Sequence, residues 1–302
     1  MAHNIETNLR GGGYKHVYVV LHYNTIKDTI DCIDSIEQHT KKSNSEIVVV
    51  DNGSPNGSGE ELKRLYAGND SVHVILNGKN VGFAKGNNVG YLYAKESLKA
   101  DFIVLLNNDT MLLRDDLQQS VIDEYEKSAC GVIGPKIITP NPPYDSNPGT
   151  SVLPSLRKTL WAIVYYSAYL LLSYVNLDLA AVRRFDKSKQ RRMIAAENNK
   201  EHPRRENVQL HGSFLIFTPT YVQLYDGLDP RTFMYGEEEL LFLRCIRRGI
   251  TTVYLPCIEV FHKEDSATNT LSFGKPVERR RFTYKNAIRS KLILALELLR
   301  KT

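Results

Sequence analysis

Short apolar runs rich in β-branched residues alternate with amphipathic segments along the N-terminal part of the chain. The first run is VYVVL at residues 17–21, and isoleucines then recur at helical spacing at positions 26, 30, 33 and 36. Three further apolar runs, at residues 47–50, 72–76 and 102–106, are each followed by a helical segment in the same way. Such alternation predicts parallel strands covered by helices on both faces. We therefore expect an α/β fold with a Rossmann-like, mostly parallel sheet flanked by helices.

Polar segments follow all four apolar runs. They are HYN at residues 22–24, DNGS at 51–54, NGKN at 77–80 and NND at 107–109. Ligands of open α/β sheets bind beyond the carboxyl ends of the strands. The four segments are therefore expected to line one rim of the sheet and to form a binding site there.

Asp51 ends the second apolar run and precedes NGSPNGSG, a segment with too many turn-forming residues for regular structure. A carboxylate there can accept hydrogen bonds from a ribose or a base, and the glycines let a ligand approach the backbone. An ordinary Asx turn explains Asp51 equally well. The later loop LNGKNVGFAKGNN, at residues 76–88, has a composition that suits a polar ligand bearing phosphates.

Asp109 is a candidate metal ligand because of its place after the fourth apolar run. A hard cation such as Mg²⁺ or Mn²⁺ takes oxygen ligands, and it needs only one or two protein carboxylates when a diphosphate supplies the rest. A helix N-cap at Asp109 or Thr110 is the competing explanation, and capping is compatible with binding.

Two further candidates lie in the later part of the chain. Residues 237–239 are three glutamates that follow FMYG and open a helix, where the dipole favours carboxylates. The leucines after them hold the helix against a core, so one glutamate could be kept at a cleft as a general base. His262 ends the apolar run IEVFH, where a histidine suits either a structural role or a metal.

The composition disfavours several classes of protein. The 302 residues, 42% hydrophobic and 24% charged, are typical of a globular protein. The formal charge of +5 is modest and spread along the chain, so nothing favours nucleic-acid binding. The four cysteines form no CxxC pair that would indicate zinc. Because the N-terminal segment lacks the apolar core of a signal peptide, we expect a cytoplasmic protein.

The alternation of strands and helices stops between residues 140 and 207. A proline-rich linker leads into an apolar segment, residues 160–182, that is long enough to span a bilayer. A single span would place the motifs before it and those after it on opposite sides of the membrane, so we do not expect this segment to cross the bilayer. Its aromatic residues and the basic residues that follow favour a helix or hairpin at the interface of an anionic membrane, through residues 160–192. A helical subdomain that packs on the core or forms a homodimer explains the segment equally well.

Seven segments in order carry a family resemblance. They are VYVVLHYN, IVVVDNGS, NVGFAKGNNVG, LLNNDT, GSFLIF, FMYGEEELLFLR and VFHKEDS. Over residues 17–266, except the insertion, the chain resembles family 2 glycosyltransferases, particularly their bacterial rhamnosyltransferase-like branch. The resemblance implies a GT-A-type fold, in which one continuous α/β domain binds a nucleotide-sugar on its N-terminal half and the acceptor on its C-terminal half.

The resemblance also implies roles for residues of the first half. Asp51 would contact the nucleoside of the donor. The other donor-binding residues would be Tyr23, Asn24, Asn80, Gly82, Phe83, Lys85, Asn87, Asn107 and Asn108. Asp109 matches the last acid of the family's DxD-like motif, which holds a divalent cation, Mg²⁺ or Mn²⁺, on the diphosphate. The first acidic position of that motif is Asn107, so metal binding rests more heavily on Asp109 and on His262, which similar proteins use as a further ligand.

Glu238 occupies the family's catalytic-base position, and Glu237 is the second choice. Inverting transfer needs a base for the acceptor hydroxyl and a cation for the departing diphosphate. The resemblance thus implies an inverting glycosyltransferase that moves a sugar from a nucleotide-diphosphate donor to a lipid-linked or polysaccharide acceptor. Synthesis of bacterial surface polysaccharide at the inner face of the cell membrane is the expected setting. A sugar nucleotidyltransferase and a non-catalytic nucleotide-binding partner subunit are the alternatives.

The expected organisation of the chain follows from these segments. It comprises a flexible leader (1–16), a nucleotide-sugar-binding half (17–139), a helical insertion (140–207), an acceptor and catalytic half (208–270) and a C-terminal helix (271–302).

Overall fold

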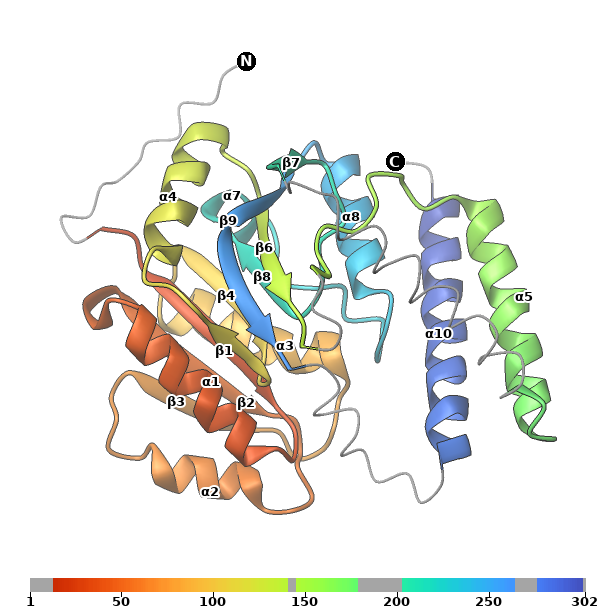
Figure 1. Cartoon of the computed structure of the whole chain (residues 1–302), viewed down its shortest axis with the longest axis horizontal. Helices are drawn as coiled ribbons and strands as arrows, with labels where there is room; N and C mark the ends of the chain where they lie inside the picture. Colours follow the sequence, from red (N-terminus) through yellow and green to blue (C-terminus); the bar gives the residue numbers. More distant parts are fainter. Residues whose placement is uncertain (1–12, 141–144, 179–202, 264–275, 301–302) are drawn as a thin grey trace.

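The computed structural model describes residues 13–140, 145–178, 203–263 and 276–300, which form a sheet with helices on both of its faces (Figure 1). Within these residues nine strands form one sheet in the order β3-β2-β1-β4-β8-β6-β9-β5, and β7 pairs with β9. The strands are β1 His16–His22, β2 Ser45–Asp51, β3 Val72–Leu76, β4 Phe102–Asn107, β5 Thr110–Leu112, β6 Val132–Ile138, β7 Arg205–Glu206, β8 Phe214–Phe217 and β9 Thr252–His262.

The sheet is parallel in its first half and mixed in its second half. Strands β1 to β4 are mutually parallel, with His22 opposite Asp51 and Leu21 opposite Asn107. The mostly parallel sheet predicted from the sequence is thus confirmed. Strand β8 then pairs antiparallel with both β4 and β6, an orientation that the alternation of strands and helices did not predict.

Two layers of helices cover the faces of the sheet (Figure 1). The described helices are α1 Ile26–His39, α2 Ser58–Leu65, α3 Phe83–Leu92, α4 Leu117–Ser128, α5 Leu156–Ser173, α7 Pro219–Val222, α8 Glu237–Arg247 and α10 Pro276–Leu299. Alternate side chains of β1 point to opposite faces, as the pleat requires. Tyr18 and Val20 pack with α1, α2 and α4, whereas Val17 and Val19 pack with α3, α7 and α8.

Helices α5 and α10 lie side by side beyond α8 (Figure 1). Their contact includes the rings of Tyr169 and Tyr284, 5.9 Å apart, and an ion pair of 2.6 Å between Asp178 and Arg280. Leu294 of α10 packs in turn on Leu240 of α8. The expected insertion therefore places a helix against the C-terminal helix. In the part of the chain that the structure describes, no helix is both long enough and apolar enough to cross a membrane.

Two boundaries differ from the sequence-based expectation. The runs at residues 251–255 and 258–262 form one strand, β9, whose register with β6 jumps from Leu255 to Glu259. Within the apolar segment 160–182, helix α5 ends at Ser173, and the residues from 179 on lie outside the described ranges together with the basic tract after them. Most of the expected leader, residues 1–12, lies outside them as well.

Gly82 provides a test of how the two halves of the fold are joined. Its φ is +90°, and a Cβ atom there would lie 2.4 Å from the carbonyl oxygen of Phe233. We expect Gly82→Ala to lower the free energy of unfolding by at least about 2 kcal/mol, because it combines a strained backbone with a clash against backbone. Thermal and denaturant unfolding measure this change. Gly78→Ala is the matched control, since nothing lies within 4 Å of its Cβ position, and an equal loss in both variants would contradict the packing described.

Candidate active site

One cavity of about 440 Å³ opens at the rim where β1 and β4 end. Its lining draws on both halves of the chain. Nine of the residues singled out from the sequence line it, and they are Tyr23, Asn80, Phe83, Asn107, Asn108, Asp109, Glu237, Glu238 and His262. The other lining residues are Leu21, Asn52, His211, Gly212, Ser213, Met234, Tyr235 and Gly236.

The antiparallel direction of β8 explains why the second half reaches this rim. Leu106 near the end of β4 pairs with Phe214 at the start of β8. The segment before β8 therefore lies beside the segment after β4, and the N–H of Asn107 donates to the carbonyl oxygen of Ser213 at 3.0 Å. Residues 211–213 thus enter the site from the opposite chain direction.

Asp109 and His262 meet at the back of the cavity. Strand β5 pairs antiparallel with β9 and sets Thr110 opposite His262. As a result, Nε2 of His262 lies 3.1 Å from Oδ1 of Asp109, with both residues nearly buried. Apart from this contact with Asp109, neither ring nitrogen of His262 has a polar partner among the described residues.

This pair fits a divalent cation that has further ligands from a bound substrate. Carboxylate oxygen and imidazole nitrogen are both ligands for Mn²⁺ and related ions, and Mg²⁺ is held in many sites by one or two carboxylates plus substrate phosphates. Within the described ranges, no group of three or more His, Cys, Asp or Glu side chains could hold a metal by itself. A cation at Asp109 and His262 would therefore depend on oxygens from the donor.

Glu238 is held in the cavity by a backbone contact. Its Oε1 accepts a hydrogen bond of 2.5 Å from the N–H of Gly212. The side chain starts from the first turn of α8, where the helix dipole favours a carboxylate. Glu238 is therefore held in position in the lining of the cavity.

Glu237 lies next to Glu238 but in a different environment. It is only 6% exposed, and its Oε1 has no hydrogen-bond partner among the described residues. Burial raises the pKa of Glu237 to about 7 from an ordinary 4.5, and the charge of Glu238 acts in the same direction. Glu237 is thus close to half-protonated at neutral pH.

Asn52 holds the loop between β3 and α3 at the edge of the cavity. Its Oδ1 accepts from the N–H of Val81 at 3.1 Å, and its Nδ2 donates to Asn80 Oδ1 at 3.2 Å. The N–H of Phe83 then donates to the carbonyl oxygen of Phe233 at 2.7 Å, in the segment that leads to α8. The loop predicted to meet the donor is therefore tied directly to the segment that carries the glutamates.

Five of the predicted donor-binding residues do not line the cavity. Asp51 accepts hydrogen bonds from Ser54 N–H at 3.2 Å and Ser54 Oγ at 2.5 Å, so its carboxylate is engaged within the turn that follows β2. Burial raises the pKa of Asp51 above its usual value. The N–H of Asn24 donates to Ser54 Oγ at 2.9 Å, so Ser54 links the turn after β1 to the turn after β2.

The other three lie in or behind α3. Gly82 packs on Phe233, and Asn87 is buried with its Nδ2 donating to the carbonyl oxygen of Phe83 at 3.0 Å. Lys85 is exposed and lines a separate groove with Tyr225 and other residues, so the structure does not bring it to the cavity.

Two polar residues of the rim serve the fold. Asn108 lines the cavity, but its Nδ2 donates to Thr25 Oγ1 at 2.7 Å and Thr29 Oγ1 at 2.9 Å, which ties the rim to α1. His22 is fully buried between Thr29 and Ser58, and burial lowers its pKa to about 4, so the ring is neutral at physiological pH.

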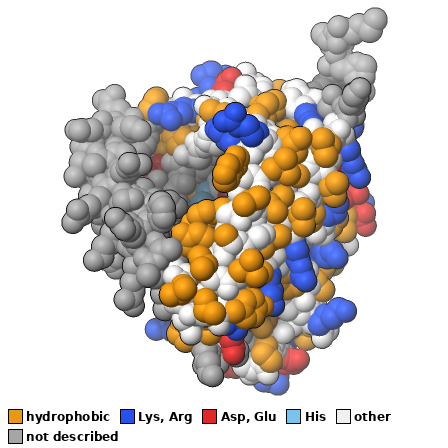
Figure 2. Space-filling model, turned by 90° about the vertical axis from the view of Figure 1, so that its right-hand side faces the viewer, with side chains coloured by type: hydrophobic (Ala, Val, Ile, Leu, Met, Phe, Trp, Pro, Cys, Tyr) orange, Lys and Arg blue, Asp and Glu red, His pale blue; other side chains and the backbone are white. Residues whose placement is uncertain are grey.

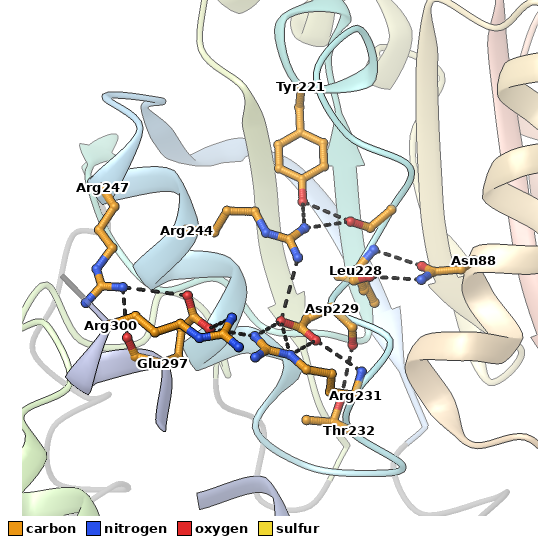
Figure 3. Close-up of polar contacts among 11 residues, drawn as sticks. Asn88, Tyr221, Leu228, Asp229, Arg231, Thr232, Arg244, Arg247, Glu297 and Arg300 are labelled. Atoms are coloured by element: carbon orange, nitrogen blue, oxygen red, sulfur yellow. Dashed lines mark hydrogen bonds and ion pairs between the residues drawn. The ribbon is translucent and has the colours of Figure 1, made fainter. Parts of the chain in front are cut away.

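A network of arginines anchors the segment that enters α8 (Figure 3). Arg231 forms a bidentate pair with Asp229, at 2.5 Å for the shortest contact, and also reaches Glu297 of α10 at 2.8 Å. Arg244 donates to the carbonyl oxygen of Gly227 at 2.9 Å. Although burial alone would raise it, the hydrogen bonds from Arg231 hold the pKa of Asp229 below its usual value. The segment before Met234 is therefore held by contacts with both α10 and α8.

Comparison with known proteins decides the family. The model of glycosyl transferase family 2 matches residues 18–177, more than half of the chain. The chain belongs to this family.

Curated relatives are glycosyltransferases as well. The low-salt glycan biosynthesis hexosyltransferase Agl10 of Haloferax volcanii is 24% identical over 254 residues, which cover 82% of this chain and 70% of Agl10. The glycosyltransferase GlyG of Streptococcus pneumoniae serotype 4 is 30% identical over 116 residues, or 38% of this chain and 37% of GlyG.

Solved structures agree on the GT-A fold. S. aureus TarS (residues 1–349) superposes with a TM-score of 0.52 at 14% identity, over 82% of this chain and 60% of TarS. GalNAc-T7, solved with UDP, GalNAc and Mn²⁺, superposes with a TM-score of 0.57 at 14% identity, over 84% of this chain and 45% of that protein. This chain therefore spans about half of each of these structures. The predicted fold class is confirmed.

The sequence analysis of this glycosyltransferase missed several residues of the cavity. His211 and Ser213 precede an apolar run instead of following one, and the rule used for parallel strands does not select such positions. Tyr235 adopts a left-handed φ of +71° ahead of Gly236, at +86°. A left-handed residue other than glycine is uncommon and concentrates at functional sites, but this φ is known only from the structure.

The buried position of Glu237 predicts a pH-dependent stability. Between pH 4.5 and about 7 the folded protein keeps a proton on Glu237 that the unfolded chain has released, so the free energy of unfolding falls as the pH rises. We expect Glu237→Gln to be more stable than the wild type by up to about 3 kcal/mol at pH 8, with no such gain at pH 4. Denaturant unfolding across this range measures the difference.

The exposed Glu61 of α2 offers a control for this experiment. Glu61→Gln should leave the shape of the stability profile unchanged. A Glu237→Gln profile parallel to that of the wild type would show that Glu237 is ionised in the folded protein and would contradict the raised pKa.

Proposed function

We propose that the protein is an inverting glycosyltransferase that moves a sugar from a nucleoside-diphosphate donor to a hydroxyl of a glycan acceptor. One observation carries the proposal. The Asp109–His262 pair from the sheet rim and Glu238 from the later half of the chain line the same cavity. A group that can hold a diphosphate through a cation thus shares the cavity with a carboxylate that can accept a proton.

The donor is assigned to the side of the cavity formed by the first half. Tyr23 and Phe83 offer aromatic faces there, and Asn80 is held by Asn52 at the same edge. Asp109 and His262 would hold Mg²⁺ or Mn²⁺ against the diphosphate. When bound, the cation would stabilise the negative charge that develops on the departing diphosphate. The Mn²⁺ and UDP in the GalNAc-T7 structure support this assignment.

The acceptor is assigned to the side of Glu238. In the proposed reaction Glu238 takes the proton from the acceptor hydroxyl while the oxygen attacks the anomeric carbon opposite the diphosphate. The new glycosidic bond forms as the bond from the anomeric carbon to the phosphate oxygen breaks, so the configuration inverts. The hydrogen bond from Gly212 keeps Glu238 oriented for this step. Glu237 is the second choice for the base, and its raised pKa suits proton transfer near neutral pH.

We further propose a polysaccharide or lipid-linked acceptor in surface glycan synthesis on the cytoplasmic side of the membrane. The name of Agl10, a glycan biosynthesis hexosyltransferase, supports a glycan acceptor. The rhamnosyltransferase-like branch remains a proposal that rests on the resemblance of the motifs. A thermal-shift screen of nucleoside diphosphates and their sugars, rhamnosyl donors included, with and without Mn²⁺ would identify the donor, since a bound ligand raises the melting temperature.

The role of Glu238 is tested by Glu238→Gln. We expect donor binding to stay within about twofold and kcat to fall by about 10² to 10⁴, because amide nitrogen and oxygen cannot accept the proton. Transfer assays at saturating donor and calorimetry measure the two quantities. Glu239→Gln is the control, as Glu239 pairs with Lys291 and does not line the cavity. Unchanged turnover in Glu238→Gln would exclude Glu238 as the base.

The role of Asp109 is tested by Asp109→Ala. The variant should lose the enhancement of nucleoside-diphosphate binding by Mn²⁺, at least about tenfold in affinity, because a carboxylate ligand is removed. Calorimetric titrations with and without Mn²⁺ measure this enhancement, and the exposed Asp70→Ala serves as the control. An undiminished Mn²⁺ effect in Asp109→Ala would place the cation elsewhere.

A further inference from the structure

The outer face of the α5–α10 helix pair is apolar and exposed. Trp161 is 69% exposed and Leu171 is 71% exposed on α5, and Leu296 on α10 is 61% exposed. Figure 2 looks onto this side of the molecule and shows hydrophobic side chains gathered over it, with Lys and Arg side chains among and beside them. Such a continuous apolar surface is uncommon on a soluble monomer and marks a place of contact.

The two faces of α5 differ in their surroundings, since one packs on α10 and the other is exposed. Tyr166, Tyr169 and Ser173 pack on α10, where Tyr284 and Arg281 meet them. The exposed residues Trp161, Val164 and Leu171 recur at helical spacing on the other face. No described residue packs on these three side chains closely enough to bury them. The exposed apolar residues therefore form a face of α5 that is distinct from the face in contact with α10.

The exposed charges on and beside this face are mostly basic. No Asp or Glu occurs in α5, which begins with exposed Arg157 and Lys158. Lys285 and Arg289 are exposed along the same stripe of α10 as Leu292 and Leu296, and Arg300 is exposed just after the helix ends.

The acids nearby are mostly engaged. Asp178 is fully buried and paired with Arg280. Glu297 is held by Arg231 and Arg247, and Glu278 is exposed at the first turn of α10.

We propose that the α5–α10 face docks on an anionic membrane surface. Apolar and aromatic side chains of a helix that lies in the interface bury among the acyl chains, and basic residues beside them bind anionic headgroups. The basic rim argues against a second copy as the occupant, since a symmetric pairing would bring like charges together. This inference concerns a surface outside the cavity and does not depend on the reaction.

The docked orientation has a consequence for the cavity if the proposed function holds. Ser290 of α10 donates to the carbonyl oxygen of Met234 at 3.1 Å, and the Tyr235 hydroxyl lies 3.4 Å from Thr283 of α10. Met234 and Tyr235 both line the cavity. Docking would therefore set the acceptor side of the cavity near the lipid surface, within reach of an acceptor that is anchored there.

The single tryptophan of the chain makes the proposal measurable without substrate. The sequence contains one Trp, and Trp161 lies on the proposed docking face. In the full-length protein we expect the emission of an exposed indole in buffer. The emission should shift to the blue when vesicles of phosphatidylcholine and phosphatidylglycerol are added, and it should not shift with phosphatidylcholine alone. Co-sedimentation with the same vesicles measures the bound fraction.

Substitutions of two exposed leucines test whether vesicle binding depends on this face or on exposed apolar residues in general. Leu171→Glu should weaken binding to the anionic vesicles by about tenfold or more, because it replaces an apolar contact with a repelled charge. Leu65→Glu is the control, since Leu65 is 57% exposed on α2, away from the helix pair (Figure 1). The double variant Arg157→Ser with Lys158→Ser should weaken binding several-fold, more at low salt than at high salt.

Several outcomes would overturn the proposal. They are the absence of binding to anionic vesicles, equal binding to neutral vesicles, and equal loss in Leu65→Glu and Leu171→Glu. Blue-shifted emission in buffer alone would show that another part of the chain or a second copy covers Trp161, and light scattering would tell these two apart. Circular dichroism confirms that each variant is folded. Because no donor or acceptor is present, a failure here leaves the proposed reaction untouched, and an inactive enzyme leaves the docking result untouched.

Discussion

The antiparallel pairing of β8 with β4 is the constraint on which the site depends. Backbone N–H and C=O groups in a buried sheet must be paired, so the register of β8 is set along its length. That register carries Gly212 and Ser213 to the rim, where Ser213 receives the N–H of Asn107 and Gly212 donates to Glu238. A parallel β8 would have left these residues at the opposite edge. The direction of a single four-residue strand thus joins the two halves of the chain into one cavity.

The two adjacent glutamates show how position on a helix separates chemical roles. Successive residues of an α-helix point about 100° apart. Both glutamates line the cavity, but Glu238 accepts from the N–H of Gly212, while Glu237 is buried and favours the protonated form. A buried carboxyl without a full set of partners lowers stability at neutral pH. The network of Asp229 and the arginines holds the preceding segment in place despite that strain (Figure 3).

The α5–α10 pair relates to the cavity through a few contacts with its acceptor side. Ser290 and Thr283 touch the backbone and side chain of residues 234 and 235, whereas the loop at residues 77–83 is held by Asn52 and Phe233. The sides proposed for the donor and the acceptor thus meet at the segment of residues 233–235, which contacts both the loop and α10. A change in the surroundings of the helix pair would act first on Met234 and Tyr235, on the side proposed for the acceptor.

The sequence by itself determined the strands of the first half, their parallel order and the polar residues at their ends, because periodicity and turn residues are local properties of the chain. Asp109, His262 and Glu238 were recognisable for the same reason, as each stands at the end of an apolar run or at the start of a helix. Only the tertiary structure decided that β8 runs antiparallel, that His211 and Ser213 enter the cavity, and that Lys85 faces away from it. It also decided which of the two cavity-lining glutamates is buried and which is held by the N–H of Gly212. These features depend on contacts between residues far apart in the chain, and no local pattern of residues encodes the direction in which a distant strand pairs.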